Sequence, residues 1–152
     1  RIDAQVTLER RASGVIAAAG GKAGGYVLFL DQGRLVHEYV GPRSRTVIES
    51  KERLPPGRHA IRVVFKKTGN AKGNLTLLVD GQQVGSGAIE DMWQSSPMSG
   101  GLTVGYDNAS PVSDRYVMPA RLTGRVEALT FDLVGDLLAN ADLEFKIAWD
   151  TD

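Results

Sequence analysis

Short segments in which apolar and polar residues alternate recur along the whole chain, and this period of two constrains the fold more than any other feature. Ile2 to Leu8 shows it near the start, and His59 to Lys67 shows it near the middle. A period of two places successive side chains on opposite faces of a β-strand, whereas a helix has a period of about 3.6 residues. About ten such segments, spaced at roughly ten to fifteen residues, predict an all-β protein, either an antiparallel β-sandwich or a jelly roll.

Turn sequences separate several of these segments. Asp80-Gly81 lies between two alternating segments and suits a two-residue type I′ turn. Asp31-Gln32-Gly33 predicts a three-residue hairpin loop, with the glycine at a position of positive φ. Leu54-Pro55-Pro56-Gly57 predicts a turn that ends a strand, because proline fixes φ and lacks an N–H. Further strands are predicted over Gly14 to Gly20, Gly24 to Leu30, Arg34 to Val40, Arg45 to Ser50, Asn74 to Val79, Gln82 to Ile89 and Leu102 to Tyr106.

The last predicted strand, Ala120 to Val134, changes phase in its middle. Its apolar residues fall on even positions as far as Val126 and on odd positions from Leu129 onward. A shift of one residue near Glu127 and Ala128 reconciles the two halves, which is what a β-bulge does. From these strand phases we expect a set of buried side chains, namely Ile61, Val63, Phe65, Leu75, Leu77, Val79, Leu129 and Phe131.

The tail from Leu137 to Trp149 fits two structures. Its apolar residues lie on one face of a helix, and Asp136 suits a helix N-terminus, but the last of them also alternate like a strand. We favour a short C-terminal helix over residues 136–149.

The length and charge of the chain bound its class. With 152 residues we expect one domain, 1–152, that is large enough to bury a hydrophobic core. The 18 basic and 18 acidic residues balance, so the chain has no net charge that would attract nucleic acid or an anionic membrane. Basic pairs at Arg10-Arg11 and Lys66-Lys67, with Arg43 and Arg45, are interpreted as solvated faces. No apolar run reaches about 18 residues, so we expect a soluble chain without a membrane partner, in the cytoplasm or the periplasm.

Two further absences bear on the possible chemistry of the chain and on its extent. There is no cysteine, which excludes disulfides, cysteine-ligated zinc and a cysteine nucleophile. The chain opens at Arg1 with neither an initiator Met nor a signal peptide, which suggests a fragment of something larger.

Catalytic patterns are weak. Two histidines, His37 and His59, are candidates for a general base or a zinc ligand, but neither lies in a nucleophile-elbow or metal-binding motif, so structural roles are favoured. Glycoside hydrolysis needs two carboxyl groups that face each other across a cleft, whereas Glu90 and Asp91 are adjacent and point to opposite faces of a strand. We therefore expect no catalysis by this chain alone.

The stretch from Asp107 to Pro119 breaks the alternation with Asn, Ser, Pro and Asp, and is predicted to be a long loop. Its oxygens, from Asp107, Asn108 and Asp114, match calcium ligands, but Asx-turn and serine hydrogen bonds explain the same residues without a metal. Sugar-stacking platforms are conceivable at five aromatic residues, although packing accounts for most of them. They are Tyr26, Tyr39, Trp93, Tyr106 and Tyr116.

The order of several segments resembles the C-terminal region of bacterial arylsulfatases. These are GVIAAAGGKAGGYVLFLDQGRLVHEYV, ERLPPGRHAIRVVF, LTLLVDGQQVGSG, LTVGYDNASPVSDRY and LTGRVEALTFDL. The resemblance covers residues 14–133, and its most specific part is G-x-D-x-x-S-P-V-S-x-x-Y, here Gly105 to Tyr116. It implies a concanavalin-A-like, laminin-G-like sandwich that follows an alkaline-phosphatase-like catalytic domain, which is absent from this chain.

The resemblance gives this chain no catalytic residue. Sulfatases carry [CS]-x-P-x-R, whose first residue becomes formylglycine, together with ligands for a divalent cation such as calcium. The nearest match, Ser95-Ser96-Pro97-Met98-Ser99, ends in serine where arginine is required. We therefore expect no cofactor in this chain, and formylglycine with the cation only in the parent.

The resemblance implies a non-catalytic accessory domain that packs on the catalytic domain of the same polypeptide and borders its substrate entrance. The alternatives are a free-standing lectin-like module that binds carbohydrate and, less favoured, a complete jelly-roll glycosidase. The loop is either a candidate contact for a partner or ligand, because recognition tends to lie on long loops carried by a rigid scaffold, or simply a corner that links two sheets. Its candidate residues are Asp107, Asn108, Ser110, Ser113, Asp114 and Tyr116.

Overall fold

The part of the chain that the structure describes forms ten β-strands in two antiparallel sheets packed face to face. A computed structural model describes residues 1–94, 101–107 and 110–132, and the described residues contain no helix. The strands are β1 (Ile2–Leu8), β2 (Gly14–Gly21), β3 (Gly24–Asp31), β4 (Arg34–Val40), β5 (Arg45–Glu49), β6 (Gly57–Gly69), β7 (Lys72–Val79), β8 (Gln82–Ile89), β9 (Leu102–Val104) and β10 (Gly124–Phe131). The predicted sandwich is confirmed, whereas the predicted C-terminal helix lies outside the described residues.

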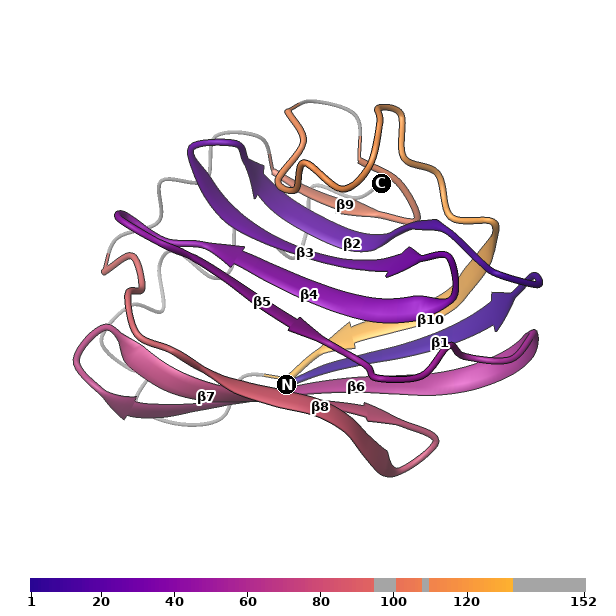
Figure 1. Cartoon of the computed structure of the whole chain (residues 1–152), viewed down its shortest axis with the longest axis horizontal. Coiled ribbons are helices and arrows are strands. Elements are labelled where there is room, and N and C mark those ends of the chain that lie inside the picture. Colours follow the sequence, from indigo (N-terminus) through magenta and orange to yellow (C-terminus); the bar gives the residue numbers. More distant parts are fainter. Residues whose placement is uncertain (95–100, 108–109, 133–152) are drawn as a thin grey trace.

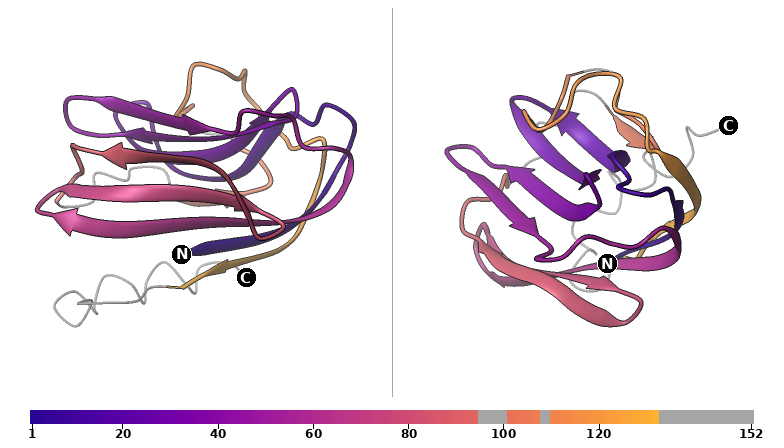
Figure 2. Two further views of the ribbon diagram at one scale, coloured as in Figure 1. Left: turned by 60° about the horizontal axis from the view of Figure 1, so that its bottom comes forward. Right: turned by 45° about the vertical axis from the view of Figure 1, so that its right-hand side comes forward.

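Each sheet has five strands. Their orders are β10-β1-β6-β7-β8 and β5-β4-β3-β2-β9, and every pair of neighbours within a sheet is antiparallel. Figures 1 and 2 show the two sheets as stacked layers, with β5 of one sheet beside β8 of the other. Gly85 and Gly87 allow this approach, because a Cβ atom on Gly85 would lie 2.8 Å from the carbonyl oxygen of Glu49.

The structure confirms one of two predicted hairpin turns and corrects the other. Asp80 and Gly81 both have positive φ and connect Val79 directly to Gln82, which confirms the type I′ turn. The predicted three-residue loop at 31–33 is wrong. Gln32 and Gly33 both have positive φ, at 48° and 91°, so two residues complete the turn. Ser13 Oγ accepts a hydrogen bond from the Gln32 N–H at 3.1 Å and helps to hold this turn.

The β-bulge in the last strand is confirmed. Opposite β1, Gln5 pairs with Ala128 and Val6 pairs with Val126, so Glu127 is the extra residue. The strand begins at Gly124, four residues later than predicted. The residues before it belong to the segment that crosses the other sheet.

The core between the sheets contains most of the side chains that we predicted to be buried. Ile61, Val63, Leu75, Leu77 and Val79 are buried, whereas Phe65 and Leu129 are partly buried against the core. Phe131 is 38% exposed, so the prediction that it is buried was wrong. It pairs with Ile2 at the end of the edge strand β10, where a side chain on the inward face has few neighbours.

A second core lies on the outer face of the sheet β5-β4-β3-β2-β9. Val27, Phe29 and Val36 point away from the other sheet and pack beneath Val112 and Ala120. Strand β2 is consequently buried at every position. Small residues suit a strand that is covered on both faces, because chain segments approach it closely from either side. The described residues hold no helix with the length and apolar character to cross a membrane.

Candidate functional site: the segment between β9 and β10

The segment from Gly105 to Thr123, described except at 108–109, runs across the outer face of the sheet β5-β4-β3-β2-β9. Figure 1 shows it in orange, beside β2 and β3. Its backbone is anchored at both ends. The Gly105 N–H donates to the Ile16 carbonyl at 2.8 Å, and the Thr123 N–H donates to the Ser13 carbonyl at 2.8 Å. The loop that we predicted here is therefore fixed along β2.

Tyr116 is the centre of the hydrogen bonding within the loop. Its hydroxyl donates to Asp107 Oδ2 at 2.6 Å and accepts from the Val112 N–H at 3.1 Å. Its ring packs edge-on against Phe29 of β3, with the centroids 5.3 Å apart. Burial, followed by the neighbouring Asp107 carboxylate, raises the pKa of Tyr116 well above its usual range, so the phenol keeps its proton and acts as a donor.

Arg115 attaches the loop to two strands. Its guanidinium donates to Asp31 Oδ2 at 2.7 Å and to Glu49 Oε2 at 2.9 Å, and it lies 5.8 Å from the centre of the Phe29 ring. The Arg115 N–H also donates to Ser113 Oγ at 3.1 Å. One cation shared by two carboxylates fixes the loop more strictly than a single exposed pair would.

Beneath the loop lies an ion pair that the sequence analysis missed. Glu38 is 3% exposed, and its Oε1 accepts from Arg45 Nη1 at 2.7 Å. The same nitrogen of Arg45 donates to the Val112 carbonyl at 3.0 Å, which connects the pair to the loop. Glu38 Oε2 is buried and has no hydrogen-bond partner in the part of the chain that the structure describes. Arg45 is itself exposed, as expected of a solvated face, but the interpretation missed that its guanidinium pairs with the buried Glu38.

The other candidate residues of the loop have separate positions. Ser110 Oγ accepts from the Lys22 N–H at 3.2 Å, and Asp114 is exposed. Asn108 lies outside the described residues. Within 1–94, 101–107 and 110–132, no group of three or more His, Cys, Asp or Glu side chains is placed to hold a metal ion.

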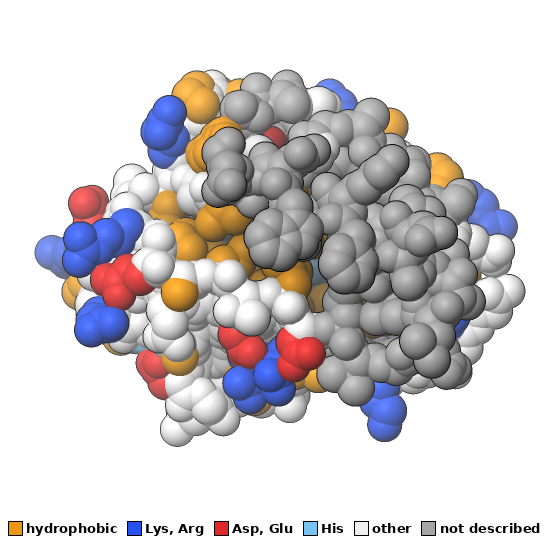
Figure 3. All heavy atoms as spheres, turned by 180° about the vertical axis from the view of Figure 1, so that it is seen from behind, with side chains coloured by type: hydrophobic (Ala, Val, Ile, Leu, Met, Phe, Trp, Pro, Cys, Tyr) orange, Lys and Arg blue, Asp and Glu red, His pale blue; other side chains and the backbone are white. Residues whose placement is uncertain are grey.

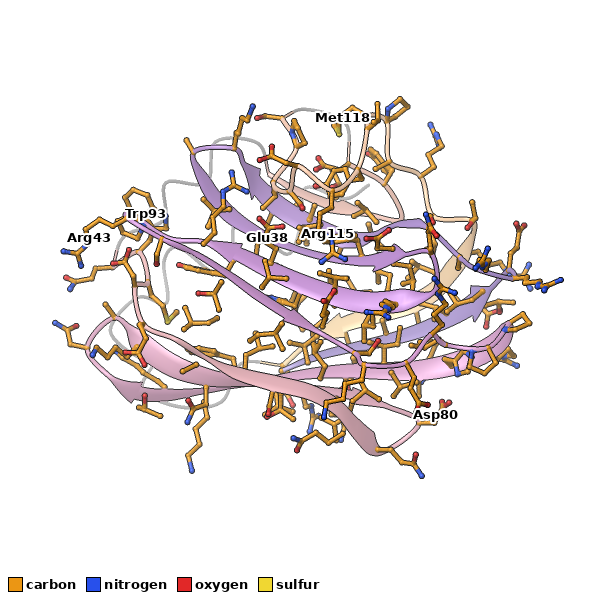
Figure 4. The ribbon with its side chains drawn as sticks, viewed as in Figure 1. Glu38, Arg43, Asp80, Trp93, Arg115 and Met118 are labelled. Atoms are coloured by element: carbon orange, nitrogen blue, oxygen red, sulfur yellow. The ribbon has the colours of Figure 1, made fainter. Side chains whose placement is uncertain are left out.

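The remaining acid candidates are separated from each other. Asp91 accepts from the Arg43 N–H and from its guanidinium, at 2.7 Å and 3.1 Å, whereas Glu90 pairs with Lys72 at 3.1 Å. Figure 4 shows Arg43 near Trp93, and away from Arg115 and Glu38. The two carboxylates thus act in different ion pairs. The serine and proline stretch at 95–99 lies outside the described residues.

The two histidines are both engaged in the fold. His37 is 4% exposed between the sheets and stacks on Tyr26, with the ring centroids 5.9 Å apart. His59 Nδ1 lies 2.7 Å from Asp80 Oδ2, and its Nε2 lies 2.7 Å from the Pro55 carbonyl oxygen. Both nitrogens of His59 therefore face acceptors.

Most of the aromatic candidates also have internal partners. Tyr39 accepts from the Trp93 N–H, and Trp93 Nε1 donates to the Val40 carbonyl, each at 3.0 Å. The Arg121 guanidinium lies 5.7 Å from the centre of the Tyr106 ring. These contacts use the aromatic residues for packing and hydrogen bonding inside the chain.

Together the two sheets and their connections define an all-β protein of the antiparallel sandwich class. The fixed segment on the outer face is the most elaborate local structure of that sandwich. No family model matches the sequence, and no curated protein matches it either.

Proposed function

We propose that this chain is a non-catalytic accessory domain of an arylsulfatase and that it packs on the catalytic domain of its parent. The sandwich fold agrees with the architecture that the sequence resemblance implies. The parent would supply the formylglycine, the divalent cation and the hydrolysis of sulfate esters. This chain would supply a rigid surface that borders the entrance to the substrate site.

The single observation that carries the proposal is the fixation of residues 110–116, in the most specific part of the resemblance. Tyr116 and Arg115 hold this loop through side chains, and Val112 fixes it through burial. A preorganised loop loses little conformational freedom when a partner binds. Next to it, Val117 is 87% exposed, so an apolar side chain on a fixed segment is presented to a partner.

The lectin-like alternative is weakened by the same segment. Many sandwiches offer one open sheet face to a ligand, but Val112, Ala120 and Tyr116 cover the outer face of the sheet β5-β4-β3-β2-β9. A sugar would have to bind at a loop or at an end of the sandwich.

The coding sequence upstream of this chain tests the proposal first. We expect a [CS]-x-P-x-R motif in the same reading frame. The catalytic domain so encoded, expressed separately, should bind this chain in calorimetry, and Val117→Asp should weaken that binding by about tenfold or more, because it places a charge in an apolar contact.

Ala88→Asp is the matched control, since Ala88 is also an exposed apolar residue but lies on β8, an edge strand of the other sheet. It should bind like the wild type. The chain alone should hydrolyse no aryl sulfate. An upstream frame without the motif, or turnover by the purified chain, would contradict the accessory role.

A further inference from the structure

Five exposed arginines gather at one end of the sandwich. They come from four separate connections: the β1–β2 turn, the β3–β4 turn, the β5–β6 connection and the segment before β10. We call this surface the arginine end, and it consists of Arg10, Arg11, Arg34, Arg53 and Arg121.

Backbone hydrogen bonds hold these connections together. The Gly33 N–H donates to the Ala12 carbonyl, and the Leu54 N–H donates to the Gly33 carbonyl, both at 2.7 Å. The Thr123 N–H donates to the Ser13 carbonyl at 2.8 Å. These bonds join the neighbours of Arg11, Arg34, Arg53 and Arg121 in one continuous surface, which lies at the right of Figure 1.

The charges of the arginine end are largely uncompensated. None of its five arginines forms an ion pair with a described residue, whereas Arg58 and Arg125, close by, both pair with Glu127. The unpaired acids of this end are Glu9 and Glu52, both exposed. Figure 3, which shows the molecule from behind, has basic side chains along its left edge with a few acidic ones between them. Five cations against two anions leave a net positive surface.

A cleft of about 310 Å³ adjoins this surface. Its lining includes Ser13, Gln32 and Thr123, which carry hydroxyl or amide groups. Its charged lining residues are Arg121, which has no ion-pair partner among the described residues, and Arg115, whose charge is matched by the Asp31 carboxylate in the same lining. A cleft lined by short polar side chains beside arginines suits a ligand with both hydroxyl and acidic groups.

Arg11 occupies an unfavourable backbone position. Its φ is 50°, in the left-handed region where glycine, asparagine and aspartate are much more common. An arginine at such a position costs some stability that a glycine would not. The charge is therefore placed at the tip of the β1–β2 turn against the local backbone preference.

We propose that the arginine end binds an acidic polysaccharide, a linear sugar chain carrying sulfate or carboxylate groups. Arginine presents a planar fork of N–H donors that matches the paired oxygens of both groups. Spaced arginines along one end suit a chain with repeated acidic groups. This inference does not depend on the accessory role, since it concerns a surface that the chain carries by itself.

The described residues favour a polysaccharide over a nucleic acid. Single-stranded nucleic acid binds by stacking its bases on open aromatic rings. The aromatic rings beside this end are already engaged, because Phe29 is buried, the Arg121 guanidinium lies over Tyr106, and Tyr116 bonds to Asp107. A membrane surface would need several apolar anchors, and Val117 alone is highly exposed next to the cleft.

The test compares two double variants of the 152-residue chain. Arg10→Gln with Arg11→Gly removes two charges from the arginine end. Lys66→Gln with Lys67→Gln removes the same amount of charge from the other end of β6. Because a strand rises by about 3.3 Å per residue, Lys66 lies about 26 Å from Arg58, which is close to the arginine end. Each is titrated with dextran sulfate, polygalacturonate, uncharged dextran, single-stranded oligothymidylate and anionic phosphatidylserine vesicles, at low and at physiological salt.

We expect the wild type to bind dextran sulfate or polygalacturonate, and not dextran, with an affinity that falls as salt rises. The arginine variant should bind about tenfold more weakly, because each cation facing an anionic surface contributes on the order of fivefold before screening. The lysine variant should bind nearly as well as the wild type. Glycine suits the positive φ of residue 11, so the arginine variant should keep its folding stability.

Three results would overturn the proposal. They are no binding of either acidic polysaccharide at low salt, equal weakening by the two double variants, and tighter binding of oligothymidylate or vesicles than of the polysaccharides. Urea unfolding of each variant shows whether a loss of binding comes from the charges or from the fold.

Discussion

Acid is expected to destabilise this protein through His37, well above the pH at which its carboxylates titrate. Burial lowers the pKa of His37 from an ordinary value of 6.5 to about 4, and its Nδ1 has no hydrogen-bond partner among the described residues. The folded state therefore holds this imidazole neutral. As the pH falls below 6.5, the unfolded chain binds a proton that the folded chain does not, so stability is lost toward acid.

The size of the effect follows from the two pKa values. The full loss, reached below pH 4, is about 3 kcal/mol, and the loss between pH 7 and pH 5 is about 2 kcal/mol. A domain of this kind is stable by only about 5–15 kcal/mol, so the loss is measurable. Tyr26, stacked on His37, does not titrate in this window, because burial raises its pKa to about 12.

The carboxylates of Asp3 and Glu127 affect the stability of the fold at a lower pH than His37 does. Hydrogen bonding to Arg62 lowers the pKa of Asp3 from 3.8 against the opposing effect of burial, and hydrogen bonding to Thr7 lowers that of Glu127 from 4.5. Groups whose folded-state pKa is lowered stabilise the fold above their unfolded-state pKa and lose that contribution as the pH falls through the folded-state value. The stability that these carboxylates contribute is lost only near or below about pH 4.5, which is below most of the pH range in which His37 destabilises the fold.

Urea unfolding at pH 7 and pH 5, followed by circular dichroism, measures the effect. His37→Phe keeps a ring against Tyr26 and removes the titrating group, so its loss between the two pH values should be smaller than that of the wild type by about 2 kcal/mol. Ile48→Val, opposite His37 in the neighbouring strand, is the control and should cost about 0.5–1.5 kcal/mol at both pH values. If the variant His37→Phe loses as much stability as the wild type, the reasoning is refuted.

Two further stability predictions test the loop and the strand phases. Tyr116→Phe leaves buried Asp107 without its hydroxyl donor and should lower the free energy of unfolding by about 1–3 kcal/mol. Tyr106→Phe should cost much less, and equal costs would mean that the hydrogen bond contributes little. Leu77→Ala should cost about 2–5 kcal/mol, whereas Phe131→Ala should cost clearly less because Phe131 is 38% exposed. Equal losses at Leu77 and Phe131 would contradict the observed burial.

Local chemistry made much of the fold predictable from the sequence. Asp80-Gly81 specifies its turn because both positions need positive φ, and the phase change around Glu127 located the bulge. The turn at Gln32 was not predictable in the same way. Its conformation is supported by Ser13, a residue of the connection between β1 and β2, which crosses from one sheet to the other.

The arrangement of the candidate site depends on contacts that no local pattern encodes. Arg115 meets Asp31 and Glu49 across 84 and 66 residues of sequence. Glu38 lies at a position that alternation marks as pointing away from the other sheet, and only the loop above it causes its burial. The second core did leave a signal in the sequence, because β2 and β3 are nearly continuous apolar runs, as strands covered on both faces are, rather than alternating segments.

The pairing of β1 with β10 has a consequence for synthesis. Ile2 pairs with Phe131, so the first strand of the described chain to be synthesised receives one of its two neighbours only after nearly all of that chain has been made. Until then β1 has an open edge, able to pair with the wrong strand or with another nascent chain. The bulge at Glu127 fixes the register at which the late strand joins, and the slowest step of folding is expected to be this closure between the two ends of the described chain.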